Sequence, residues 1–197
     1  DAVAACVVFK MGKPSKKDYR KFNIKTVEGP DDYASMKEVV RRRYTRAIEE
    51  QSPLPDLIIT DGGKGQMEVV REVIEDELQL NIPIAGLAKD SKHRTSELLY
   101  GFPPMTIGVK QSTPLFHLLE NIQDEVHRFA ITFHRDKRSK NQVSSILDGI
   151  PGIGEKRKTA LLKAFRSVSR IKKASLEDIA EIVGINTAKN IKEKLKE

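Results

Sequence analysis

Apolar and polar positions over the first two thirds of the chain repeat with two different periods. Apolar or alternating runs of a few residues predict strands, and apolar positions three or four residues apart predict helices. The resulting order is two strands, a helix, a strand, a helix, a strand, a hairpin and a long helix. The approximate ranges are 3–9, 19–27, 32–48, 57–59, 67–78, 82–88, 98–109 and 115–133. This order predicts an α/β domain with a mixed sheet flanked by helices.

The last third of the chain has a different pattern. Residues 136–145 are polar and basic and show no periodicity, so we expect a basic linker there, after a first domain at 1–135. In residues 146–197, a glycine turn between apolar residues opens a Lys-rich helix twice, with Gly152 and Gly184 at equivalent places. This internal duplication predicts a small all-α domain of two similar units.

Charge separates the same two regions. Residues 1–135 hold 20 Lys and Arg against 20 Asp and Glu, whereas residues 136–197 hold 15 against 8. The entire net charge of +7 therefore lies in the last third. A basic domain joined to a neutral one favours nucleic-acid binding through neutralisation of phosphates. A basic surface that only keeps the protein soluble is the alternative.

Composition limits the class of protein. With 39% hydrophobic and 32% charged residues, the chain is typical of a soluble globular protein. No apolar run approaches the roughly 20 residues of a membrane helix, and we find no signal peptide, so we expect no membrane partner. The abrupt start at Asp1 suggests a fragment. The single cysteine, Cys6, cannot form an internal disulfide and suits the cytoplasm, as a buried thiol.

The glycine turns of the tail suit contact with an anion. Glycine allows close approach and positive φ, and the helix N-terminus that follows presents free amides to phosphate. The candidate DNA contacts are Gly152, Gly154, Lys156, Arg157, Lys158, Gly184 and Lys189. The two units resemble a tandem helix-hairpin-helix domain, although Asn186 stands where a second glycine is usual. Such contacts are to the DNA backbone and predict little sequence specificity. A purely structural αα-hairpin is the alternative.

Asp61 is the first candidate for chemistry. It follows the apolar run 57–59 and precedes two glycines and Lys64, and in α/β sheets chemistry collects at the carboxyl ends of strands. An Asp before Gly is also common in ordinary turns. Lys64 is a candidate phosphate contact, as is Lys89. The glycines are too closely spaced for a P-loop, which excludes nucleoside triphosphate binding of that kind.

Several sequence blocks occur here in the order found in one protein family. They are Pro30-Asp-Asp-Tyr-Ala-Ser-Met, Arg41-Arg-Arg-Tyr44, Asp61-Gly-Gly-Lys-Gly-Gln66, Gly86-Leu-Ala-Lys89 and Asp124-Glu-Val-His-Arg-Phe-Ala-Ile131. With the paired hairpins, these blocks closely resemble the C-terminal half of the UvrC family. The resemblance implies a ribonuclease-H-like endonuclease domain that uses Mg²⁺ or Mn²⁺ to make the 5′ incision beside a lesion in bacterial nucleotide excision repair. It also implies damaged double-stranded DNA and UvrB as partners, with UvrA acting earlier in the pathway. A separate N-terminal half would make the 3′ cut.

The family resemblance assigns roles to three residues. An Asp-Asp-His triad is implied, of which two members map onto Asp61 and His127. Asp61 would hold the cation, and His127 would orient water, act as a base or bind metal as a neutral imidazole. Spacing alone favours an exposed or core-rim histidine at 127, whereas the family block Asp-Glu-x-His favours a functional one; His134 is an alternative. Asp32 has either a functional role or a helix-capping one.

One departure from the family pattern bears on activity. The first catalytic Asp is expected in an Asp-Ile-Ser-His block on a strand before residue 3, and this sequence has no such block. Either the chain starts late or the segment is missing, and without that carboxylate we expect no cutting. The rival functions are a non-catalytic DNA-binding module on a degenerate nuclease fold and an RNA-directed nuclease of the same fold.

Overall fold

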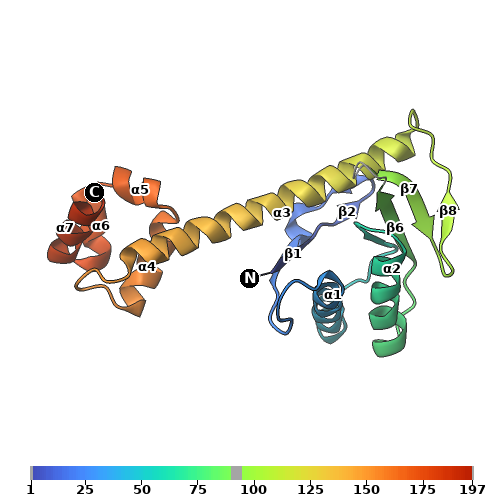
Figure 1. The fold of residues 1–197 in the computed structure, drawn as a ribbon, viewed down its shortest axis with the longest axis horizontal. Coiled ribbons are helices and arrows are strands. Elements are labelled where there is room, and N and C mark those ends of the chain that lie inside the picture. Colours follow the sequence, from blue (N-terminus) through green and yellow to red (C-terminus); the bar gives the residue numbers. More distant parts are fainter. Residues whose placement is uncertain (1, 90–94, 197) are drawn as a thin grey trace. The chain divides into compact units, whose positions relative to one another are not determined.

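The structure is a computed structural model that describes residues 2–89 and 95–196 (Figure 1). The chain divides into two units, Asp1–Ala130 and Ile131–Glu197. The long helix α3, Pro114–Leu147, begins in the first unit and ends in the second. Thr113 caps this helix, since its Oγ1 accepts a hydrogen bond from the Phe116 amide at 3.3 Å.

The N-terminal strands of the first unit form two short antiparallel ladders. β1 pairs with β4, and β2 pairs with β3 across a turn in which Met11 and Gly12 have φ of 53° and 77°. The predicted antiparallel pair is therefore present, with shorter strands than the ranges above. The elements are β1 (Val3–Cys6), β2 (Phe9–Lys10), β3 (Lys13–Pro14), the 3-10 turn η1 (Lys16–Asp18) and β4 (Arg20–Asn23).

The remaining strands form a mixed four-stranded sheet in the order β5-β6-β7-β8. β5 runs parallel to β6, whereas the β6–β7 and β7–β8 pairs are antiparallel, which confirms the predicted mixture. Among the described residues, no ladder joins this sheet to the β1–β4 pair. The strands are β5 (Ile58–Thr60), β6 (Ile84–Lys89), β7 (Thr95–Tyr100) and β8 (Met105–Ile107).

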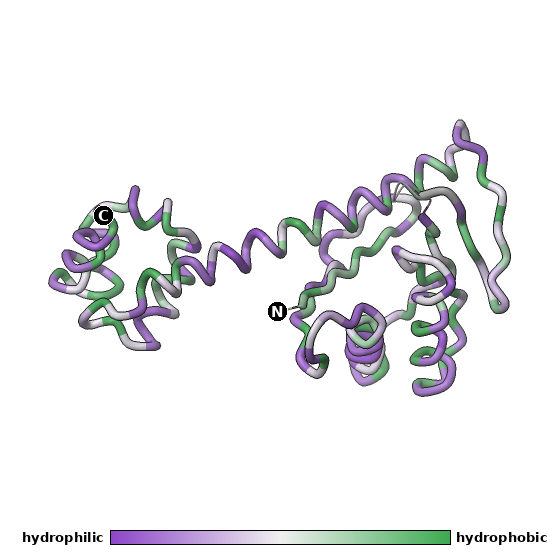
Figure 2. The backbone as a smooth tube through the Cα atoms, in the orientation of Figure 1, coloured by the Kyte–Doolittle hydropathy of each residue, from purple (hydrophilic) through white to green (hydrophobic). Residues whose placement is uncertain are grey.

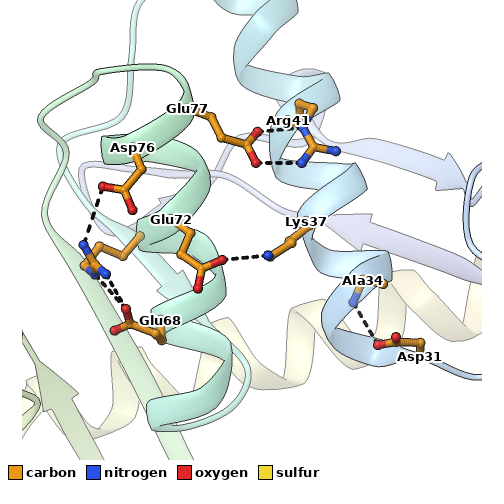
Figure 3. A network of polar contacts seen from close by, with 9 residues as sticks. Asp31, Ala34, Lys37, Arg41, Glu68, Glu72, Asp76 and Glu77 are labelled. Atoms are coloured by element: carbon orange, nitrogen blue, oxygen red, sulfur yellow. Dashed lines mark hydrogen bonds and ion pairs between the residues drawn. The ribbon is translucent and has the colours of Figure 1, made fainter.

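Helices α1 (Asp32–Glu49) and α2 (Lys64–Arg71) pack together in the first unit, and α2 continues as the π-helical turn η2 (Glu72–Glu77). On their surface, Lys37–Glu72 and Arg41–Glu77 ion pairs of 2.6 and 2.7 Å join α1 to η2 (Figure 3). The apolar core between the helices and β6 consists of Val40, Tyr44, Met67, Val70, Val73, Ile74, Ile82 and Ile84.

A buried carboxylate on α1 fixes the chain after β4. The Glu38 side chain is 4% exposed and accepts hydrogen bonds from the Lys25 and Thr26 amides, the Thr26 hydroxyl and Arg42. Burial by itself raises the pKa of Glu38, but these donors outweigh it and lower the pKa to about 2. Glu38 is therefore an ionised structural residue.

The second unit is all helical, as the sequence predicts. It contains the end of α3 followed by α4 (Glu155–Phe165), α5 (Val168–Lys173), α6 (Leu176–Val183) and α7 (Ile185–Lys194). Its core consists of Val143, Leu147, Ile150, Leu161, Ile171, Ile179, Val183, Ala188 and Ile191.

Residues 136–145, expected as a basic linker, are helical. They continue α3, and Val143 is 0% exposed in the core of the second unit. Figure 2 shows this part of α3 as mostly hydrophilic. Lys, Arg and Gln are good helix formers, and a solvated helix has no apolar face that periodicity could reveal. Within the described part of the chain, none of the helices has the length and apolar content needed to cross a bilayer.

Candidate active site and nucleic-acid interface

The turn after β5 places Asp61 at the carboxyl end of a strand. The buried Thr60 donates from Oγ1 to the carbonyl of Gly62 at 2.9 Å, and Gly63 then opens α2. On the neighbouring strand, a Cβ at Gly86 would lie 2.5 Å from the Gly62 oxygen and 2.7 Å from Met67 Sδ. Glycine at 86 thus permits β6 to pack directly against the turn that carries Asp61.

Three side chains from distant parts of the sequence converge on Asp61. His127 Nε2 lies 3.0 Å from Asp61 Oδ2, and Gln123 Nε2 donates to Oδ1 at 3.1 Å. Lys89 Nζ, at the end of β6, lies 3.5 Å from Oδ1. Gln123 and His127 are four residues apart on α3 and therefore share one face of the helix.

These contacts control the charge of Asp61. Its partial burial raises the pKa, but the hydrogen bonds from Gln123 and His127, with the positive charge of Lys89, outweigh burial and lower the pKa. Asp61 is therefore a carboxylate at neutral pH. A carboxylate can only accept hydrogen bonds, so the contact with His127 requires a proton on Nε2 of the imidazole.

A second group of contacts holds α3 in place over the β1–β4 pair. Tyr19 donates from its hydroxyl to Glu125 Oε1 at 2.9 Å and packs edge-on against Phe129, with ring centroids 5.0 Å apart. Glu125 also accepts two hydrogen bonds from Arg128. Glu125 thus docks the helix that carries His127.

Asp32 and Lys64 lie outside this cluster. The cap of α1 is Asp31, whose Oδ1 accepts from the Ala34 amide at 2.9 Å, so a capping role for Asp32 is wrong. Asp32 is the first residue of α1 and Lys64 the first of α2, and both are exposed. Neither side chain has a hydrogen bond or ion pair with another described residue.

The two glycine turns of the second unit each contain a glycine at positive φ. Gly152 and Gly184 have φ of 90° and 85°, a region that glycine adopts without strain. Helix α4 opens at Gly154 and α7 at Gly184, and neither helix has a side-chain hydrogen bond at its N-cap. Both N-termini therefore present backbone amides that no capping side chain covers, as an anion site needs.

The basic residues of the first hairpin have different roles. Arg157 donates from Nη1 to the Gly152 carbonyl at 2.6 Å, and Lys158 Nζ lies 2.6 Å from Asp148 Oδ1. Both therefore brace the turn. Lys156 and Lys189 are exposed and have no side-chain partner among residues 2–89 and 95–196. These two lysines are the cations most available to an outside phosphate.

Helix α7 supports the turn of the first hairpin. The buried Thr187 lies so close to Gly152 that a Cβ there would be 2.6 Å from Thr187 Oγ1. Asn190 Nδ2 also donates to the Pro151 carbonyl at 3.5 Å. The second hairpin helix therefore packs against the turn of the first hairpin and supports it.

Comparison with known proteins finds a matching family for each of the two units. Residues 1–131 match the family described as the UvrC RNAse H endonuclease domain, and residues 144–197 match the SAM-like helix-hairpin-helix tandem. The chain belongs to the UvrC family. Over 195 residues it is 80% identical to the UvrABC system protein C of Bacteroides thetaiotaomicron and 78% identical to that of Bacteroides fragilis. Each alignment covers 99% of this chain but only 32% of the relative.

UvrC membership confirms the ribonuclease-H-like domain and the helix-hairpin-helix tandem expected from the sequence. The metal site remains an expectation. Among the described residues of this UvrC chain, no three His, Cys, Asp or Glu side chains are grouped to hold a metal. Asp61 and His127 offer one carboxylate and one imidazole, donor types that suit Mn²⁺ and, through oxygen, Mg²⁺. They fit part of such a site, which needs further oxygen ligands.

Sequence reasoning overlooked one residue of the candidate site and one contact of another. Gln123 was not a candidate, although its place four residues before His127 was a usable signal. The phosphate contact expected for Lys89 stays a prediction, and the structure adds its contact with Asp61. The place of Lys89 at the end of β6, beside the end of β5, could have indicated this contact.

Proposed function

We propose that this chain is the part of a UvrC protein that makes the 5′ incision in nucleotide excision repair in the cytoplasm. The observation that carries the proposal is the 3.0 Å approach of His127 to Asp61 at the carboxyl end of β5, in a UvrC RNAse H endonuclease domain. The helix-hairpin-helix tandem would hold damaged double-stranded DNA by its backbone. We propose UvrB as its partner, with UvrA acting earlier in the pathway. We also propose an N-terminal half of the same protein that makes the 3′ cut.

Each residue of the site has a part in this reaction. Asp61, ionised at neutral pH, would hold Mg²⁺ or Mn²⁺, which supplies charge neutralisation and an activated water when bound. His127 would orient that water or accept its proton, because its imidazole lies at the same carboxylate. Gln123 fixes the carboxylate by occupying Oδ1. Lys89 offers positive charge to Asp61 or to an incoming phosphate.

The test uses a chimera in which the upstream part of the Bacteroides thetaiotaomicron relative precedes Asp1. We expect this protein, with UvrB, to cut a lesion-containing duplex on the 5′ side in the presence of Mg²⁺ or Mn²⁺. Asp61→Ala and His127→Ala should each lower the single-turnover rate on the order of a thousandfold and leave duplex binding unchanged. Asn121→Ala, an exposed change on α3, is the control. Normal 5′ cutting by both site variants would refute the assignment.

The alternative function is a non-catalytic DNA-binding module on a degenerate nuclease fold, in which only the helix-hairpin-helix tandem acts. The same chimera separates the two proposals. Duplex binding without metal-dependent cutting would favour the module, and cutting that depends on Asp61 would exclude it.

A further inference from the structure

The segment of α3 just before the helix-hairpin-helix core is rich in cations. Between residues 134 and 142 the only carboxylate is Asp136. Arg135, Arg138 and Lys140 are exposed, and none has a hydrogen bond or ion pair with another described residue. The cations of the segment are Arg135, Lys137, Arg138 and Lys140.

Helical geometry directs two of these cations away from the core of the second unit. Val143 and Leu147 bury one face of α3 in that core. At about 100° per residue, Arg138 lies roughly 180° from Leu147 around the helix, and Arg135 lies roughly 120° from it. Arg135 and Arg138 are three residues apart and therefore neighbours on the solvent face. The structure thus contains a basic face whose side chains do not contribute to the packed core.

A solvated face elsewhere in this protein has a different character. On α1, cations are paired with carboxylates, as in the Lys37–Glu72 and Arg41–Glu77 pairs that join this helix to η2 (Figure 3). Such pairing keeps a surface polar with little net charge. The α3 face lacks it, and it belongs to the same unit as the hairpin N-termini at Gly154 and Gly184. Charge complementarity and this continuity favour a polyanion as its partner.

We infer that Arg135 and Arg138 form a further phosphate-binding surface that extends the hairpin contact along the backbone of the same DNA duplex. The inference rests on the proposed DNA-binding function. From Arg135 to Leu147 the helix rises about 18 Å, at about 1.5 Å per residue. One strand of B-DNA offers a phosphate about every 3.4 Å of axis, so this length spans roughly five phosphates. Contacts of this kind add affinity without sequence preference.

The test measures duplex affinity against salt concentration by fluorescence anisotropy, using the whole chain and an undamaged labelled duplex. Each phosphate contact contributes about 0.9 to the slope of log K against log salt, so Arg135→Gln with Arg138→Gln should lower the slope by about 1.8. The charge-retaining pair Arg135→Lys with Arg138→Lys should keep the slope. The matched control is Arg170→Gln with Lys173→Gln, exposed cations also three residues apart, at the C-terminal turn of α5.

The outcomes separate this inference from the proposed function. Suppose that Arg135→Gln with Arg138→Gln leaves the salt slope unchanged while Lys156→Gln lowers it. The α3 surface is then refuted, and hairpin binding stands. An equal loss in the Arg170 and Lys173 control would show an effect of total charge and would also refute the surface. If the unaltered chain does not bind duplex, both proposals fail. Thermal melting of every variant verifies that it is folded.

Discussion

The two units of the protein use charge in opposite ways. In the first unit, the cations that hold the fold and the candidate site are paired: Arg41 with Glu77, Arg42 with the buried Glu38, and Lys89 with Asp61. In the second unit, exposed cations such as Lys156 and Lys189 have no partner among the described residues. Charge in the first unit fixes the fold and the candidate active site. Charge in the second unit is available to an outside partner.

The units also differ in how far apart their functional residues lie in the sequence. Asp61 meets Gln123 and His127, which are 62 and 66 residues away. Each candidate anion site in the second unit would instead be formed by one glycine turn and the helix that follows it. The first site thus depends on tertiary packing, and the second on local backbone geometry. Four substitutions test this difference.

Gly86→Ala should have the largest effect. The new Cβ would lie 2.5 Å from the Gly62 backbone oxygen, so the turn carrying Asp61 must move. We expect a stability loss of about 3 kcal/mol. Cutting by the chimera should fall on the order of a hundredfold, because a small misplacement of a catalytic group is costly.

Gly108→Ala is the control for this change, since a Cβ there meets nothing within 4 Å. DNA binding by the second unit should survive Gly86→Ala, as measured by duplex anisotropy. Full cutting activity in Gly86→Ala would show that Asp61 does not depend on the packing of β6 against its turn.

Gly152→Ala should have the second-largest effect, a loss of stability in the second unit. Positive φ costs an alanine about 1–2 kcal/mol, and contact with Thr187 adds roughly 1 kcal/mol. Gly184→Ala also places alanine at positive φ, but its Cβ meets nothing within 4 Å, so this change is the comparison. Hydrogen exchange of the α4–α7 amides measures the loss of stability in each variant. Equal destabilisation by the two changes would contradict the Thr187 contact.

Much of the fold was predictable because burial imposes periods on the sequence. The order of strands and helices in the first unit follows from that patterning, and the strand end that carries Asp61 was located correctly. The glycine turns were equally predictable, since positive φ at Gly152 and Gly184 is a local property. Patterning could not identify the helical segment 136–145, because it covers nothing apolar before Val143.

The composition of the candidate active site was less predictable. His127 came from the family resemblance, since its spacing alone favours an exposed or core-rim histidine. Gln123 and the role of Lys89 depend on how α3 and β6 pack around β5; their spacing signalled where they lie, but not their contacts with Asp61. The choice between adjacent residues Asp31 and Asp32 as the cap likewise required backbone geometry.

Glu38→Gln should reveal a pH dependence confined to the first unit. The pKa of Glu38 is lowered from 4.5 to about 2, so its ionised form contributes stability above pH 4.5. That contribution is lost as the pH falls through about 2. At neutral pH the substitution should cost about 2 kcal/mol, because the Lys25 and Thr26 amides lose acceptor capacity.

Tyrosine fluorescence measures the unfolding of the first unit alone. The chain has 4 Tyr and no Trp, and Tyr19, Tyr33, Tyr44 and Tyr100 all belong to the first unit. Urea unfolding followed by tyrosine emission should show the stability difference between the two proteins narrowing from pH 4.5 towards 2. Glu49→Gln, at an exposed position on α1, is the control. A difference that stays constant over this range would mean that the pKa of Glu38 is not lowered in the folded protein.

Gln123→Ala should have the smallest effect and gives the most direct test of convergence at Asp61. Loss of its 3.1 Å hydrogen bond frees Asp61 Oδ1, but His127 and Lys89 still restrain the carboxylate. We expect a loss of about 1 kcal/mol in transition-state stabilisation, roughly fivefold in single-turnover cutting by the chimera, with duplex affinity unchanged. The exposed Asn121→Ala on the same helix should cut normally. If Gln123→Ala instead weakened duplex binding and left the cutting step unaffected, Gln123 would be a DNA contact, and the division of roles between the two units would need revision.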